Sequence, residues 1–328
     1  MRLLVLGGTR FVGRALVEEA LARGHDVTAL HRGVTGRLPD GVRALHADRT
    51  DGAALRAALG DGQWDAVVDT WAGAPEVAAA AAEALRDRVG AAAYVSSRSV
   101  YRWPLQPGAD ESAPVVDAGG TGYAADKRGG ELAWQAAFPD ALLLRAGLVV
   151  GPYEDLGRLP WWLDRVAEGG DVLAPGRPQR WLQLVDARDL AAFALDRVAD
   201  GGCYDVGSLP GHASTEELLE ACVDATGAET ELVWVDEDDL LAAGVEPWTQ
   251  LPCWVPSTGE LAGLMEGDTS AAHAAGLVCR PVEETVSDTW AWVQREGRPA
   301  PRPDRPSVGL PREVELRLLG DALAAEHH

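Results

Sequence analysis

The stretch 2-RLLVLGGTRFVGRALVEEALAR-23 decides the expected fold. Residues 2–6 form a short, mostly apolar run that closes on glycine, which is typical of a strand buried in a parallel sheet. Residues 11–23 then carry apolar side chains at helical spacing and end at Gly24. A buried strand, a tight turn and a helix together make the first half of a βαβ unit.

The same alternation continues through the first half of the chain. More strands are expected at HDVTALHRG, GVRALHAD, WDAVVDT and AAAYVSS, and ALLLRAGLVVGP predicts a sixth strand. Helices are expected at DGAALRAALG and around 75–89. Because crossovers between parallel strands are right-handed, such helices cover both faces of one sheet. We therefore predict an α/β protein with a doubly wound parallel sheet of the Rossmann type.

The pattern loosens after Gly151, where helical segments mix with short strands and with a loop rich in Trp and Pro at 245–258. This half is expected to form a smaller, mixed α/β cap that contributes substrate contacts. A Pro-rich stretch, RPAPRPDRPSVGLP, precedes a last segment at 312–325 that is either one surface helix or disordered. The expected division is a Rossmann domain at 1–150 with 181–206 returning to its sheet, a cap at 151–180 and 207–297, and a linker and tail at 298–328.

Composition argues against several classes of protein. The formal net charge of −22 disfavours nucleic-acid binding, because such surfaces need clustered Lys and Arg to displace counterions. The four cysteines are far apart and the histidines are dispersed, so no zinc-site spacing appears and no metal is expected. No apolar run approaches the roughly 20 residues of a membrane span, and the start does not fit a signal peptide. A cytoplasmic location is the expectation.

The turn GGTRFVG lies between the first strand and the first helix. Glycines there let the backbone approach a pyrophosphate, which then sits at the positive end of the helix. The sequence therefore predicts a dinucleotide site. Arg10 stands where the middle glycine is usual, and a cation there should point at phosphate. The residues expected to hold the cofactor at this turn are Gly7, Thr9, Arg10, Phe11, Val12 and Gly13.

The end of the second strand, VTALHRG, indicates which nucleotide binds. Asp or Glu usually holds a free ribose 2′-hydroxyl here, but this chain has His31 and Arg32 and no nearby acid. Arg32, with Arg10 on the same side, can clamp a 2′-phosphate through paired donors, so we predict NADP in preference to NAD. Asp48 is placed either to meet the adenine amino group or to cap the following helix. Thr70, after the fourth strand, is expected to complete the cofactor site.

Lys127, within 121-TGYAADKRGG-130, is the only lysine in the chain. Tyr123 precedes it by four residues, so a helix would place both side chains on one face. A neighbouring ammonium and a nicotinamide cation favour the ionised form of a tyrosine, which makes it a competent acid or base. Lysine is a compact charge that also binds ribose hydroxyls, whereas the wide, planar guanidinium of arginine serves such a site poorly.

Together these motifs resemble those of the extended short-chain dehydrogenase/reductase superfamily, often labelled NAD-dependent epimerase/dehydratase. The resemblance rests on the glycine-rich start, 94-YVSSRSVY-101, the Tyr-x-x-x-Lys pair and 145-RAGLVVGP-152, and it covers about residues 1–235. Within the superfamily, GGTRFVG, DAVVDTWAG and QRWLQLVDARDLA are most similar to a reductase-like actinobacterial branch. That branch is related to chloroplast stem-loop RNA-binding proteins.

The resemblance implies roles for individual residues. Tyr123 becomes the proton donor or acceptor at the substrate oxygen, and Lys127 holds the nicotinamide ribose and favours the ionised form of Tyr123. Ser97 matches the hydroxyl that hydrogen-bonds the reacting carbonyl, and Ser99 either shares that role or satisfies the end of a strand. Dehydratases of the superfamily place an Asp-Glu pair where this chain has Arg98 and Ser99, and epimerases use an asparagine, a residue this chain lacks. Plain hydride transfer needs neither feature, so a reductase is the preferred interpretation.

Twelve tryptophans against five tyrosines and three phenylalanines suggest a bulky, flat or apolar substrate, although any single tryptophan can equally serve core packing. Trp248 and Trp254 lie in the capping half. Arg158, Arg177 and Arg180 are either ligands for an anionic group or solvated charges. The residues expected to contact substrate are Trp71, Ser99, Trp103, Trp161 and Trp162.

The sequence therefore predicts a cytoplasmic, NADP(H)-dependent oxidoreductase that transfers hydride between a ketone and an alcohol of a bulky, cyclic or aromatic small molecule. Two alternatives stay open. One is an epimerase of a sugar or nucleotide sugar that retains its cofactor, and the other is a non-catalytic NADP-binding regulator or RNA-binding protein. The expected partners are a small-molecule substrate and a second copy of the chain, joined through helices 75–89 and 123–137, with neither nucleic acid nor membrane.

Overall fold

The computed structural model describes residues 1–298 and 307–326. Its larger part is a seven-stranded sheet with the strand order β10-β6-β5-β4-β1-β2-β3. Every neighbouring pair is parallel, which confirms the predicted α/β class and the doubly wound Rossmann sheet. The strands are β1 Arg2–Leu6, β2 Asp26–His31, β3 Arg43–His46, β4 Trp64–Asp69, β5 Val89–Ser97, β6 Leu142–Ala146 and β10 Gly202–Val206.

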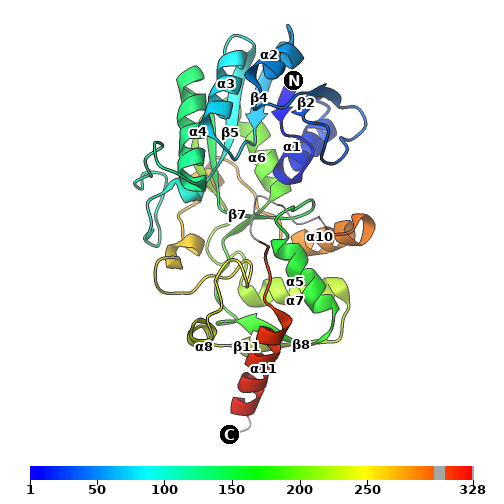
Figure 1. Cartoon of the computed structure of the whole chain (residues 1–328), viewed down its shortest axis with the longest axis vertical. Helices are drawn as coiled ribbons and strands as arrows, with labels where there is room; N and C mark the ends of the chain where they lie inside the picture. Colours follow the sequence, from blue (N-terminus) through cyan, green and yellow to red (C-terminus); the bar gives the residue numbers. More distant parts are fainter. Residues whose placement is uncertain (299–306, 327–328) are drawn as a thin grey trace.

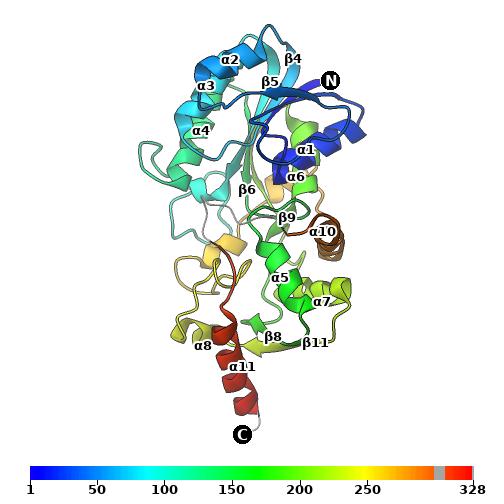
Figure 2. The same cartoon turned by 45° about the vertical axis from the view of Figure 1, so that its right-hand side comes forward.

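Helices cover both faces of this sheet (Figure 2), because successive side chains of a strand point to opposite sides. The helices of the first face are α1 Phe11–Ala22 and α6 Ala187–Arg197, and those of the second are α2 Gly52–Leu59, α3 Pro75–Leu85 and α4 Tyr123–Ala137. In β1, Leu3 and Val5 pack in the core under α1 and α6, whereas Leu4 and Leu6 pack in the core under α2, α3 and α4. All four side chains are fully buried.

The cap lies below the sheet in Figure 1, at the end where the strands finish. It has its own core, between α5 Arg158–Ala167, α7 Thr215–Thr226 and a small sheet in which β11 Thr230–Val235 pairs with β8 Gly170–Pro175. A second small sheet, β7 Leu148–Val150 with β9 Leu184–Asp186, forms the junction between the two parts. The remaining elements are α8 Glu237–Ala242, α9 Ser270–Ala274, α10 Val282–Glu296, α11 Arg312–Glu326, and the short 3₁₀ helices η1 Arg98–Val100 and η2 Ala262–Met265.

The stretch predicted as one sixth strand divides at Gly147. β6 pairs with β5 and β10 as far as Ala146. Gly147 N still donates to Val206 O at 3.0 Å, and the next three residues leave the sheet as β7, which pairs with β9. Both halves of the stretch are buried, so their apolar character could not reveal the break.

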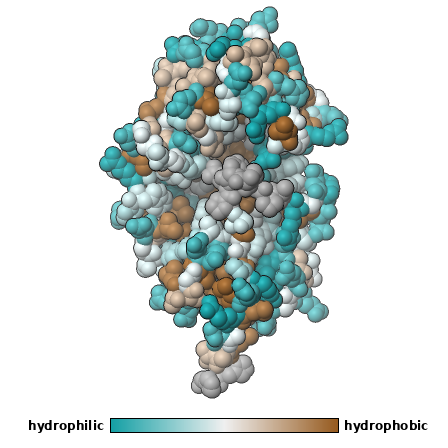
Figure 3. Space-filling model, viewed as in Figure 1, coloured by the Kyte–Doolittle hydropathy of each residue, from teal (hydrophilic) through white to brown (hydrophobic). Residues whose placement is uncertain are grey.

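Exposed residues on the face shown in Figure 3 are mainly hydrophilic, with hydrophobic residues gathered chiefly on the lower half, which the cap forms. None of the helices within residues 1–298 and 307–326 is long and apolar enough to cross a membrane. The same residues contain no group of three His, Cys, Asp or Glu side chains that could hold a metal ion.

The last helix, α11, is part of the cap. It packs on the outer sheet of β8 and β11, at the end of the molecule opposite the N-terminus (Figure 1). Glu315 on α11 is 2% exposed and accepts two hydrogen bonds from Arg165 Nε, at 2.8 and 2.9 Å. The segment assigned to linker and tail thus joins the cap core, whereas its residues 299–306 and 327–328 lie outside the described part of the chain. Leu318 and Leu319 of α11, and Leu310 just before it, belong to that core.

The buried pair gives a first prediction. Replacing Glu315 by Ala leaves the buried Arg165 guanidinium with only the exposed Glu168 carboxylate, 3.6 Å from Nη1, as a counter-charge, so we expect the free energy of unfolding to fall by about 3 kcal/mol. Urea denaturation followed by circular dichroism measures this change. The matched control is Glu313→Ala on the exposed side of the same helix, for which we expect less than about 0.5 kcal/mol. Equal losses of stability in the two variants would contradict a specific stabilisation by the Glu315–Arg165 pair.

Candidate active site

The turn between β1 and α1 is too tightly packed for side chains at two positions. Gly7 has a φ of +102°, and a Cβ added there would lie 2.6 Å from Thr70 Oγ1. A Cβ on Gly13 would lie 1.8 Å from the carbonyl oxygen of Gly7. These glycines bring the start of α1 against the ends of β1 and β4, where a chain of backbone amides can receive a pyrophosphate. The residues present therefore fit a dinucleotide.

Arg10 precedes α1, and its side chain is 47% exposed. Its Nη1 lies 3.3 Å from Asp155 Oδ2 in the loop after β7. In this structure Arg10 thus links the turn to the cap, and a phosphate would compete with Asp155 for it. Thr9 Oγ1 lies 2.9 Å from a hydroxyl of the loop after β2, and Phe11 and Val12 are half-buried against the core under α1.

Three side chains lie at the ends of β2 and β3. His31 Nδ1 accepts from Gly33 N at 3.1 Å, and the His31 ring lies 4.6 Å from that of His46. Burial lowers the pKa of His31, and His46 adds to this effect. Its neutral form therefore predominates at neutral pH, with the proton on Nε2 because Nδ1 is an acceptor. Arg32 follows β2 and is exposed.

Asp48 follows β3, with an exposed carboxylate. Hydrogen bonds from Thr50 hold the pKa of Asp48 below its usual range, and the nearby charge of Arg32 adds a smaller effect. The alternative that Asp48 caps the next helix is wrong. Asp51 caps α2, since its Oδ1 accepts from two backbone amides of the first turn at 2.8 and 3.1 Å. Asp48 is thus available at the edge of the sheet near Arg32.

Lys127 is fixed at the carboxyl ends of two strands. Its Nζ donates to the carbonyl oxygens of Trp71 and Val95, each at 2.6 Å, and its side chain is 3% exposed. The ammonium also lies 4.8 Å from the centre of the Tyr94 ring. The Tyr94 hydroxyl donates to the same Trp71 carbonyl at 2.9 Å. These contacts hold the Lys127 ammonium in one position. The longer and wider guanidinium of an arginine would not fit there.

Two glycines after Lys127 allow α4 to lie this close. A Cβ on Gly130 would lie 2.3 Å from the Tyr94 hydroxyl, and one on Gly129 would lie 2.6 Å from Pro75 Cβ in α3. Glycine costs about 1 kcal/mol inside a helix relative to alanine. That cost is offset here by contact of α4 with β5 and α3.

Tyr123 and Ser97 lie at the same edge of the sheet as Lys127. Tyr123 is the first residue of α4, one turn before the lysine, and is 36% exposed. Ser97 ends β5, two residues after the carbonyl that binds Lys127. Ser97 Oγ accepts from Ser99 N at 3.2 Å and lies 3.1 Å from Ser99 Oγ, and both serines are half-buried. A phenol, an ammonium and a hydroxyl are thus grouped at one edge of the sheet.

Comparison with known proteins identifies the family of the chain. The sequence pattern of the NAD dependent epimerase/dehydratase family matches residues 3–207. The chain belongs to this family. Of its relatives, the 2'-dehydrokanamycin reductase of Streptomyces kanamyceticus is 33% identical over 214 residues, which are 61% of this chain and 58% of that protein. The 3-diazoavenalumate denitrifying reductase of a Streptomyces species is 31% identical over 226 residues, covering 61% and 74%.

Solved structures show the same fold. WbmH of Bordetella bronchiseptica, in complex with NAD+, superposes with a TM-score of 0.68 at 22% identity, over 90% of this chain and 99% of WbmH. Its low identity makes this a likeness of fold alone. The chain spans little more than half of the length of the 2'-dehydrokanamycin reductase. The similarity therefore does not show that the two proteins have the same activity.

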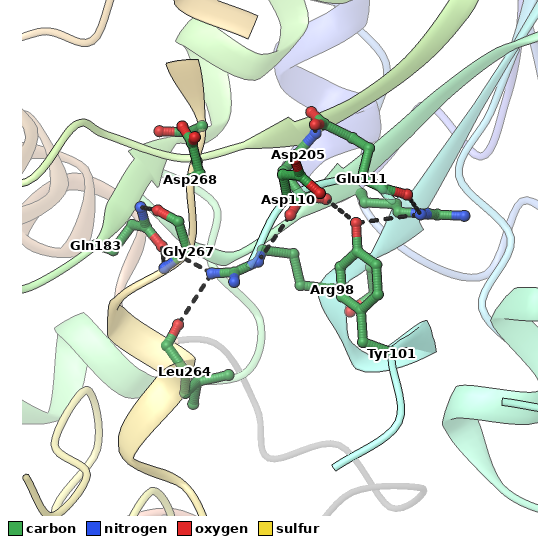
Figure 4. A network of polar contacts seen from close by, with 12 residues as sticks. Arg98, Tyr101, Asp110, Glu111, Gln183, Asp205, Leu264, Gly267 and Asp268 are labelled. Atoms are coloured by element: carbon green, nitrogen blue, oxygen red, sulfur yellow. Dashed lines mark hydrogen bonds and ion pairs between the residues drawn. The ribbon is translucent and has the colours of Figure 1, made fainter. Parts of the chain in front are cut away.

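Where dehydratases of the epimerase/dehydratase family are expected to carry an acid, Arg98 enters a buried polar network (Figure 4). Its Nη1 donates to Gln183 Oε1 at 2.7 Å and to Leu264 O at 3.1 Å. Its Nε lies 3.3 Å from Asp205 Oδ2, close enough for an ion pair although the two are not aligned as a hydrogen bond. The Tyr101 hydroxyl donates to the other oxygen of Asp205 at 2.6 Å. Arg98 thus connects η1 to β10 and to the cap loop before Gly267.

Arg145 extends the network to α4. It donates to the Tyr101 hydroxyl at 3.1 Å and through Nε and Nη2 to both oxygens of Glu131, at 2.9 and 3.1 Å. Glu131 is fully buried and also accepts from Ser96 Oγ at 2.7 Å. These paired charges fix α4, β5 and β6 relative to one another. Sequence reasoning missed them, although an arginine inside the apolar strand LLLRA requires a buried partner.

A second buried group lies at the end of β4. Both terminal nitrogens of Arg49 bind the Asp69 carboxylate, at 2.5 and 2.8 Å, and Trp134 Nε1 donates to it at 2.9 Å. Arg49 also lies 5.0 Å from the centre of the Trp71 ring, and Trp71 Nε1 donates to Ala74 O. Trp71, expected to contact substrate, is thus held in the loop between β4 and α3, with its indole N–H satisfied.

The tryptophans expected in the substrate site lie in different surroundings. Trp162 is 2% exposed in the cap core and donates to Pro252 O at 2.6 Å, so it supports the cap instead of facing a ligand. Trp161 lies edge-on to it, 4.7 Å between ring centres, and packs against Gly309 near the start of α11. Trp103 is half-buried in the loop after η1.

The network makes stability depend on pH through Asp205. Burial raises the pKa of Asp205 from 3.8 to about 6, against the opposing charge of Arg98. The folded protein therefore holds this proton more tightly than the unfolded chain. The proton on Asp205 therefore stabilises the folded protein by an amount on the order of 3 kcal/mol. This stabilisation is present below about pH 4 and is lost as pH rises to about 6. We expect the free energy of unfolding of the wild type, relative to Asp205→Asn, to fall over this range.

Urea denaturation at intervals from pH 4 to pH 7 measures the difference between the two proteins. Asp239→Asn is the control, because Asp239 is an exposed carboxylate in α8 and its loss should leave the pH profile unchanged. A wild-type advantage that stays constant across the range would contradict a raised pKa for Asp205.

Proposed function

We propose that this protein is an NADP(H)-dependent oxidoreductase that interconverts a ketone and an alcohol of a bulky, cyclic or aromatic small molecule. The observation that carries the proposal is the buried Lys127 ammonium, held by two carbonyl oxygens one helical turn from Tyr123. When bound, a nicotinamide cofactor supplies or accepts a hydride at its C4 atom. All other chemistry falls to the chain's own side chains.

Tyr123 exchanges the proton. In the direction of reduction its hydroxyl gives a proton to the substrate oxygen as the carbonyl carbon receives hydride, and solvent restores the phenol. The fixed positive charge of Lys127, one helical turn along α4, stabilises the negative charge that develops on the phenol oxygen as the proton leaves. Ser97 donates its hydroxyl hydrogen to the same substrate oxygen and orients the carbonyl.

The absence of an acid at Arg98 supports hydride transfer over elimination as the type of reaction. Arg98 stands in the place where the related dehydratases carry an acid, and its guanidinium is bound into the network with Asp205. Elimination therefore has no acid from that residue. Two relatives more than 30% identical are named as reductases, which agrees with plain hydride transfer.

This assignment predicts the effect of removing one oxygen. Tyr123→Phe should lower kcat for NADPH-dependent ketone reduction about 10³-fold, because the proton donor is lost, while the Kd for NADPH changes less than threefold. Stopped-flow absorbance and NADPH titration measure the two quantities. Tyr204→Phe in β10 is the matched control and should leave both near wild type. A Tyr123→Phe variant with wild-type kcat would contradict the role given to Tyr123.

The preference for NADP rests on Arg32 and Arg10. No acid stands at the end of β2 to hold a 2′-hydroxyl, whereas Arg32 is exposed there and Arg10 is half-exposed at the facing turn. A charge-assisted hydrogen bond to phosphate contributes about 1.5–3 kcal/mol. This finer assignment goes beyond the family description, which names NAD.

Arg32→Ala should therefore weaken NADPH binding tenfold or more and leave NADH binding almost unchanged. Parallel calorimetric titrations of both cofactors give the ratio of their Kd values. Arg43→Ala, which removes the same charge at the first residue of β3, controls for the loss of net charge. Equal affinity of the wild type for NADPH and NADH would overturn the phosphate clamp.

A further inference from the structure

Two residues of the cap loop 245–258 hold a backbone conformation that side chains disfavour. Trp248 and Cys253 both have a φ of +68°, which costs a bulky residue about 1 kcal/mol or more. The loop is closed by its own backbone, since Trp248 N donates to Trp254 O at 3.0 Å. The result is that the Trp248 ring lies over the guanidinium of Arg158, with 5.6 Å from Cζ to the ring centre.

Arg158 begins α5 and is 7% exposed. Its Nε donates to Glu154 Oε1 at 2.7 Å, and its Nη2 donates to Val149 O at 2.6 Å. Nη1 makes no hydrogen bond to any residue of 1–298 or 307–326, so two N–H groups remain for a ligand. Glu154 is fully buried and neutralises the guanidinium, which makes the pair uncharged as a unit.

The pair lies where the cap meets the sheet. Arg158 Nη2 binds the carbonyl oxygen of Val149 in β7, a strand of the junction. Glu154 lies beside Asp155 in the loop after β7, and Asp155 Oδ2 lies 3.3 Å from Arg10 Nη1 at the glycine turn. Trp248 and Arg158 therefore border the junction on the side of the cap, near the turn expected to hold the cofactor.

We propose that Trp248 and Arg158 form the cap's half of the substrate site, and that this subsite takes a flat ring bearing an uncharged hydrogen-bond acceptor. This subsite proposal rests on the proposed function, which sets where the reacting carbonyl lies. The half-buried indole offers a stacking surface, and Arg158 Nη1 offers the donor. Because Glu154 already balances the guanidinium, a carbonyl or hydroxyl oxygen suits the site better than a carboxylate or phosphate, which would add an unbalanced buried charge.

Isatin is a suitable probe, since it is a flat ring with a ketone beside a neutral lactam carbonyl. Calorimetry measures its Kd for the protein saturated with NADP+, which cannot turn it over. We expect Trp248→Ala to weaken binding about tenfold through lost stacking, and Trp248→Phe to stay within about threefold of wild type. Arg158→Lys keeps the charge beside Glu154 but shortens the donor, and should also weaken binding. Trp181→Ala, which removes a 52% exposed indole just before β9, is the matched control.

Turnover gives a second readout. Each reduction consumes one NADPH and one proton and converts the isatin ketone to an alcohol. 2,3-Butanedione has the same pair of carbonyls without a ring, so the ratio of kcat/KM for isatin to that for butanedione should fall about tenfold in Trp248→Ala. Circular dichroism confirms that each variant is folded.

The outcomes separate the two proposals. Wild-type protein that does not bind isatin, or Trp248→Ala that binds it as tightly as wild type, would overturn the subsite. Binding that depends on Trp248 without NADPH consumption on either dicarbonyl would support the subsite and overturn the proposed oxidoreductase. Isatin binding weakened as strongly by Trp181→Ala would also count against the subsite, because the effect would not be local.

Discussion

A buried polar chain runs from Glu131 through Arg145 and Tyr101 to Asp205 and Arg98, and the arrangement of the candidate active site depends on it. An ion buried without a counter-charge costs several kcal/mol, so the fold keeps each of these charged side chains beside one of opposite sign. Glu131 lies one turn after Lys127 on α4, and Arg98 follows Ser97 directly. The same contacts that satisfy the buried charges therefore set the rotation of α4 and the end of β5, and with them the positions of Tyr123, Lys127 and Ser97.

The buried charges lie next to the residues on which the family resemblance rests. The glycine turn, the tyrosine–lysine pair and the serine lie at one edge of the sheet. Arg98 departs: where an acid could act on a substrate, the side chain instead joins η1 to Gln183, β10 and the cap loop. The position that the resemblance gives to an acid thus carries an anchor between the two parts of the molecule, and the proposed hydride and proton transfer does not use it.

The sequence predicted features that depend on neighbours along the chain. Apolar periodicity gave the sheet and its helices, and the spacing of Tyr123 and Lys127 gave their common helix face. Patterns along the sequence could not predict pairings between distant segments. Arg145 meets Glu131 only because β6 lies beside α4, and Glu315 meets Arg165 only after the last helix folds onto the cap. Trp162 was expected at the substrate, but tryptophan is equally suited to a core, and only packing shows which role it has.

The central claim is net hydride transfer from the cofactor to a substrate carbon, with Tyr123 supplying the proton. A single measurement tests it most directly: incubate the protein with isatin and NADPH deuterated separately on each face of C4, and locate the deuterium by NMR. We predict that one of the two cofactors, and not the other, places deuterium on the new carbinol carbon, with one NADPH consumed for each alcohol formed. Deuterium that never leaves the cofactor, or a substrate that returns with no net consumption of NADPH, would contradict the account and favour an enzyme that retains its cofactor.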